Sequence, residues 1–213
     1  MALRATGQSS SSDRKKLLQK MLNEIPGLLE EAVDACTAPR HQREARDEYG
    51  KMLRRKWFGR KRGRIRHTFK DILRHIEARD VFVDTDGQHH EGAHAYTPDD
   101  QKLKIYLCPL FYRDSVDGQL ATIVHELTHL VRKTIDFEEE SPSLEDVLRF
   151  ETIQDKINIT PENIKEQKKA FFIKFANDER SATSAYNFEY FILDLISEVR
   201  GTGVIDEALK PVR

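Results

Sequence analysis

Apolar residues recur at helical spacing over most of the chain, and the alternation typical of strands is confined to one stretch. The expected helices cover residues 17–38, with a break at Pro26, and 41–56, 65–77, 119–133, 143–156, 161–177 and 179–200. Between Asp80 and Pro109 the segments VFVD and KIYLC are short β-type runs, separated by a turn-rich segment. The pattern predicts an α+β, mostly helical protein with one small β-sheet.

Length and composition favour one compact domain. The chain has 213 residues, of which 38% are hydrophobic and 33% charged. The mean hydropathy is −0.63, and no stretch approaches the roughly 18 apolar residues of a membrane span. We expect no membrane span.

The first 13 residues are Ser-rich and lack the apolar region of a secretory signal, so they are expected to be a disordered tail. The localisation is then cytoplasmic, or export follows a non-Sec route, or the chain is a mature form whose signal has been removed.

Positive charge is concentrated in one segment. Lys and Arg total 35 against 36 for Asp and Glu, yet residues 54–66 hold eight basic residues and no acid. Such a run can contact phosphates, but Trp57 and Phe58 within it are typical core anchors at a helix end. We therefore interpret the segment as a solvated basic face and do not expect nucleic acid as a partner.

Residues 125–129 read HELTH, which is the HExxH zinc signature. On a helix, Leu120, Ile123, Val124, Leu127 and Val131 share one face, while His125 and His129 project from the other. Residues four apart lie one above the other, so both imidazoles can bind one zinc ion. Glu126 is placed beside them to accept a proton from a zinc-activated water and pass it to the leaving amine.

Two residues downstream could supply a third zinc ligand. Asp136, in KTIDFEEE, follows the motif closely, whereas Glu179, in NDERSATSAY, would approach from a second helix. Each has an ordinary structural explanation as well: Asp136 belongs to an acidic run, and Glu179 is a favourable charge at a helix N-terminus. Spacing alone leaves both open.

Several collinear segments resemble the deuterolysin and lysine-specific metallo-endopeptidase family, the aspzincins. In order they are KWFG (56–59), AYTP (95–98) leading into KIYLCPLFY, the LATIVHELTHL helix, TID (134–136) and SAYNFEYF (184–191). The resemblance implies a zincin-like metallopeptidase domain over residues 56–213, forming one compact unit with a helical segment at 14–55. It also implies that His125, His129 and Asp136 hold one Zn²⁺ and that Glu126 is the general base.

The chain departs from the family's GTxDxxYG and NAD patterns at functional positions. Lys133 replaces the glycine, and Glu139 replaces the tyrosine that the resemblance assigns to oxyanion stabilisation, which leaves Tyr186 or Tyr190 as substitutes. In lysine-specific members two acidic residues receive the substrate lysine. Those positions are Tyr186 and Glu189 here, so a basic-residue preference is expected to be weakened.

The sequence therefore predicts a zinc-dependent metallo-endopeptidase acting on a protein or peptide, with some preference for Lys beside the scissile bond. Two alternatives remain. One is a peptidase of the gluzincin type that uses Glu179 as its third ligand. The other is a zincin-derived binding module or toxin-like effector with little turnover, whose inhibitor or immunity partner the sequence does not identify.

Overall fold

The computed structural model describes residues 2–7, 11–37, 45–86, 93–98, 103–136, 169, 172–173, 176–177, 179–199 and 209–213. Along the chain the elements are β1 (Leu3–Thr6), α1 (Ser12–Leu22), α2 (Ile25–Ala35), α3 (Ala45–Phe58), α4 (Arg62–Ala78), β2 (Val81–Asp84), β3 (Ala95–Tyr96), β4 (Lys104–Leu107), η1 (Phe111–Arg113), α5 (Val116–Arg132), η2 (Glu179–Thr183) and α9 (Ala185–Val199). The predicted class, mostly helical with one small sheet, is confirmed. No helix in these residue ranges is long and apolar enough to cross a membrane.

The sheet has the strand order β1-β2-β4-β3, in which only β3 runs antiparallel to its neighbour. The expectation of a disordered tail at residues 1–13 is wrong for its first half. Leu3 pairs in register with Val81 and is 3% exposed, so β1 is an integral strand. Its partner lies 78 residues away, and local patterning over four residues does not reveal such a pairing.

Helix boundaries follow local chemistry closely. Pro26 stands in the first turn of α2, where its missing N–H costs nothing. Ser11 caps α1, because its Oγ accepts from the backbone N–H of Arg14 at 3.2 Å. The helices expected at 143–156 and over most of 161–177 lie outside the described residues.

The single helix predicted at 179–200 is divided into η2 and α9. At the junction Ser184 forms a parallel bridge with Ile135, in which the N–H of Ala185 donates to the carbonyl of Ile135 at 3.2 Å. This long-range pairing interrupts the helical ladder. It also fixes the segment that follows α5 against the start of α9.

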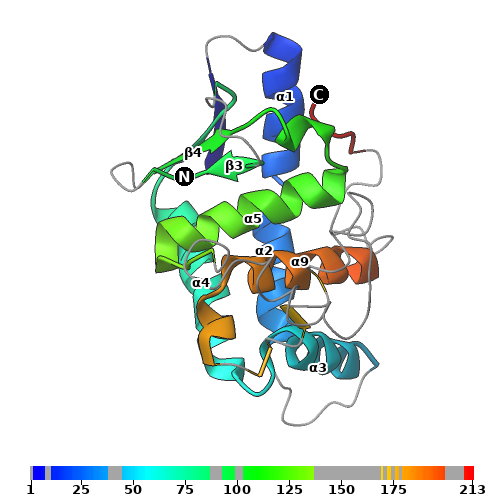
Figure 1. The fold of residues 1–213 in the computed structure, drawn as a ribbon. Coiled ribbons are helices and arrows are strands. Elements are labelled where there is room, and N and C mark those ends of the chain that lie inside the picture. Colours follow the sequence, from blue (N-terminus) through cyan, green and yellow to red (C-terminus); the bar gives the residue numbers. More distant parts are fainter. Residues whose placement is uncertain are drawn as a thin grey trace, which may run out of the picture.

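The helix α5 lies between the sheet, which has α1 beside it, and the helices α2, α3, α4 and α9, of which α9 and α4 pack along α5 (Figure 1). Its apolar face is fully buried at Leu120, Ile123, Val124 and Leu127. Trp57 and Phe58 are also fully buried, as expected for core anchors at the end of α3. Because α5 is packed on both sides, it holds its polar side chains in fixed positions.

Cys36 and Cys108 are both buried. Neither participates in a disulfide, and each fills core volume as a small apolar side chain.

Candidate metal centre

The polar face of α5 carries the HELTH residues. His125 is 6% exposed and Glu126 is 5% exposed, so both are held in a largely water-free setting. The helix begins at the N-cap Ser115, whose hydroxyl accepts from the N–H of Gly118, and ends at Lys133 in the left-handed conformation. The face that the sequence assigned to chemistry is thus shielded from water along with the apolar face of the same helix.

The two histidines direct their Nε2 atoms at each other, at a distance of 3.0 Å. His129 Nδ1 donates to the carbonyl of Thr134 at 2.6 Å, and His125 Nδ1 donates to the carboxylate of Glu189 at 2.9 Å. Both partners only accept, so Nδ1 carries the proton and a neutral ring presents its Nε2 lone pair. Two lone pairs thus converge on one point, as metal ligands do.

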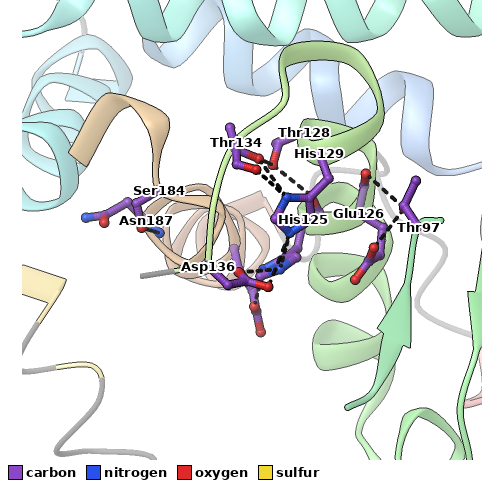
Figure 2. A network of polar contacts seen from close by, with 10 residues as sticks. Thr97, His125, Glu126, Thr128, His129, Thr134, Asp136, Ser184 and Asn187 are labelled. Carbon is purple, nitrogen blue, oxygen red and sulfur yellow. Dashed lines mark hydrogen bonds and ion pairs between the residues drawn. The ribbon is translucent and has the colours of Figure 1, made fainter. Parts of the chain in front are cut away.

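Asp136 completes this cluster from the segment after α5 (Figure 2). Its Oδ1 lies 3.1 Å from His125 Nε2 and its Oδ2 lies 3.4 Å from His129 Nε2. Burial alone raises the pKa of Asp136, but its close contacts with the two imidazoles outweigh burial and hold that pKa well below its usual range. The carboxyl is therefore ionised.

Glu126 lies on the other side of the histidines, next to β3 (Figure 2). Its carboxylate accepts a hydrogen bond of 2.8 Å from the hydroxyl of Thr97, which directly follows β3. Burial raises the pKa of Glu126, and the neighbouring histidines offset part of that rise. A carboxylate with a raised pKa suits transfer of a proton near neutral pH.

Two carboxylates thus compete as the third member of a metal set. His125, Glu126 and His129 can each offer one ligand atom within 4.8 Å of the others. Asp136 approaches the imidazole nitrogens more closely, at 3.1 and 3.4 Å, and Glu126 is already held by Thr97. Of the two carboxylates, Asp136 is therefore the nearer to the imidazole nitrogens.

The residues present fit a zinc ion. Bonds of about 2.0–2.1 Å in a tetrahedral site place neighbouring ligand atoms roughly 3.3 Å apart, and the three separations here are 3.0, 3.1 and 3.4 Å. Asp136 Oδ1 is buried without a hydrogen-bond partner, which a bound cation would remedy. Burial lowers the pKa of His125, yet Asp136 and Glu189 together raise it well above its usual value, so the pocket favours positive charge.

The remaining predicted residues are distributed differently from expectation. The ring of Tyr186 packs edge-on against the His125 ring, with centroids 4.9 Å apart. Tyr190 is 5% exposed and stacks on Trp57 at 5.3 Å, so it belongs to the core and does not lie at the centre as an oxyanion donor. Glu179 is the first residue of η2, but its side chain is outside the described residues, as is Glu139.

Residues that orient the centre were missed by sequence reasoning. Thr97 holds Glu126, and the carbonyl of Thr134 holds His129. Thr128 donates to the carbonyl of His125 at 2.7 Å and lies 2.6 Å from the Thr134 hydroxyl. Thr97 lies in AYTP and Thr134 lies in TID, two of the segments that carry the family resemblance. The resemblance therefore contained a signal from which both residues could have been predicted.

An HExxH helix with a third ligand candidate from the following segment, carried on an α+β domain, defines a zinc metallopeptidase of the zincin type. The model of the lysine-specific metallo-endopeptidase family, the aspzincins, matches residues 43–147. The solved structure of a zinc peptidase from Grifola frondosa is similar in fold, with a TM-score of 0.59, 16% sequence identity, and coverage of 87% of this chain and 97% of that chain. No curated protein matches the chain by sequence. Residues 43–147 thus match the aspzincin family, and the chain is a metallo-endopeptidase with zinc as its cofactor.

Proposed function

We propose that the chain hydrolyses peptide bonds with Glu126 as general base, at a zinc site formed by His125, His129 and Asp136. The observation that carries this proposal is the convergence of two Nε2 lone pairs and an ionised carboxylate within 3.0 to 3.4 Å, with a buried carboxylate of raised pKa beside them. Structural polar clusters pair donors with acceptors, whereas the atoms that converge at the centre of this cluster, the two Nε2 atoms and the Asp136 oxygens, are all acceptors.

Each residue has a distinct part in the reaction. A zinc ion bound by the three ligands would polarise the scissile carbonyl and lower the pKa of a coordinated water to about 7. Glu126 would accept a proton from the attacking water and later deliver it to the leaving amine. Thr97 supports this by fixing one carboxylate oxygen of Glu126 and leaving the other available.

A preference for basic side chains belongs to the same proposal. Glu189 lies on α9 beside the centre and its side chain is 21% exposed, so its charge is only partly screened by water. Tyr186 occupies the position of the second acid and brings an aromatic ring in its place. We expect enrichment of Lys or Arg next to the cleaved bond and no strict selection.

The test compares the wild-type chain with Glu126→Gln on a denatured protein mixture. The isosteric amide cannot accept the proton, so kcat should fall by about 10²- to 10⁴-fold while zinc content stays near one ion per chain. Mapping the cleavage sites on the same mixture measures the side-chain preference. Equal, near-zero cleavage by both proteins would contradict the proposal and favour a zinc-binding module without turnover.

A further inference from the structure

Glu189 reaches across a helix interface to a zinc ligand. It lies on α9, whereas His125 lies 64 residues earlier on α5, and these two helices pack against each other. Glu189 Oε2 is 2.9 Å from His125 Nδ1, and the two side chains are 21% and 7% exposed. The contact is short, shielded from water and made through the ring nitrogen that points away from the ligand cluster.

The other histidine is held in a different way. His129 Nδ1 donates to a neutral backbone carbonyl, that of Thr134, at 2.6 Å. A carboxylate acceptor does more than a carbonyl, because its charge raises the basicity of the imidazole and fixes the proton on Nδ1 more firmly. Of the two imidazole ligands, His125 is therefore the one whose strength as a zinc ligand depends on a charged side chain.

This contact competes with the role that the family pattern gives to the same position. A carboxylate that receives a substrate lysine needs both charge and free oxygens facing the substrate. In Glu189 one oxygen is bonded to His125, and the second acid of the family pattern is replaced by Tyr186. One oxygen of Glu189 is thus held by the proposed zinc ligand, and only the other remains for a substrate.

We propose that Glu189 is a positioning residue, which orients His125 and strengthens zinc binding through the Nδ1 hydrogen bond. This inference rests on the proposed zinc site, and it assigns Glu189 a role that does not depend on which peptide is cleaved. Residues of this kind change metal affinity by about 10- to 100-fold when removed.

Two substitutions separate charge from hydrogen bonding. Glu189→Met keeps the length of the side chain but removes the acceptor, so zinc affinity should fall by about 10- to 100-fold. Glu189→Gln keeps a neutral amide oxygen that can still accept from Nδ1–H, so its loss should be clearly smaller. Glu198→Gln is the matched control, since Glu198 is an exposed glutamate on the same helix.

Zinc affinity is measured at pH of about 7 by competition with a chromogenic chelator, and Co²⁺ absorption reports the ligand geometry. The expected order of affinity is wild type, then Gln, then Met, with a changed Co²⁺ spectrum in the Met variant. Thermal unfolding of the metal-free proteins identifies a variant that fails to fold. If Glu189→Met does not fold, the zinc affinity of Glu189→Gln is compared with that of the control Glu198→Gln.

The proposal is overturned if both Glu189 variants bind zinc like the wild type and only their cleavage-site profile changes. It is also overturned if the wild type binds no zinc, which removes the proposed function as well. A wild type that binds zinc with the predicted order but cleaves nothing would refute the proposed function alone.

Discussion

Two polar clusters meet α9, and they differ in how completely the chain satisfies them. Asp194 accepts from Lys56 Nζ at 2.6 Å, from Lys169 Nζ at 2.9 Å and from Trp57 Nε1 at 2.9 Å. Burial raises the pKa of Asp194, but these hydrogen bonds outweigh it and leave the pKa lowered. Carboxylate, cations and donors are matched within this cluster, and it needs nothing further.

In the metal centre, by contrast, the acceptors are not all matched by donors or cations. Asp136, Glu126 and Glu189 all lie around two imidazoles, and one buried oxygen of Asp136 has no hydrogen-bond partner. An excess of acceptors in a buried site costs stability unless a cation is bound. The difference teaches that the Asp194 cluster serves the fold, whereas the centre on α5 is built for a metal and is incomplete without it.

The largest expected effect is on metal retention. Asp136→Ala removes the proposed third ligand and should lower zinc affinity by more than about 100-fold, beyond the effect of an outer hydrogen-bond partner. Glu179→Ala should retain its zinc. Metal analysis after dialysis measures both. If Asp136→Ala keeps zinc and Glu179→Ala loses it, the third ligand comes from η2 and Asp136 is not a zinc ligand.

Zinc removal should separate the two clusters next. A ligand that binds only the folded state adds about 2.7 kcal/mol to the unfolding free energy when its free concentration is 100 times Kd. Urea unfolding with zinc and with chelator should show this increment in the wild type and in Asp194→Asn, but not in Asp136→Ala. An increment that disappears in Asp194→Asn would mean that the two clusters are coupled.

The Asp194 cluster should respond to pH, with a smaller effect. Asp194→Asn replaces charge-assisted hydrogen bonds by neutral ones, so we expect a loss of roughly 2 kcal/mol near pH 7. Because the folded pKa of Asp194 is lowered, its contribution is present above the unfolded pKa of about 3.9 and is lost as pH falls through the folded value. The difference between wild type and variant should therefore shrink below about pH 4 in metal-free unfolding experiments.

Sequence periodicity predicted the parts of the molecule that depend on local chemistry. The helix of the HELTH motif, its buried face and the opposing histidines follow from spacing, and α5 extends over Val116–Arg132 against a predicted 119–133. Strand β1 and the division at Ser184 did not follow, since each depends on a partner distant in the sequence. The same holds for the centre: Glu189 was predicted to lie there, but its hydrogen bond to His125 crosses between helices.

Lys133 connects the end of α5 to the ligand segment, and it gives the smallest and most local prediction. It is the C-cap of α5 with φ 50° and ψ 45°, and it is the one non-glycine residue with positive φ among the described residues. The family pattern has glycine here, which adopts this conformation without steric cost. Lys133→Gly should raise the unfolding free energy of the metal-free protein by roughly 0.5–1 kcal/mol, because relief of about 1–2 kcal/mol of left-handed strain exceeds the entropy that glycine loses.

Lys133→Ala is the matched control: it removes the same exposed side chain but keeps the Cβ, so it should give no gain. Urea unfolding of the three proteins decides, and equal values for the Gly and Ala variants would show that the left-handed backbone costs this chain nothing.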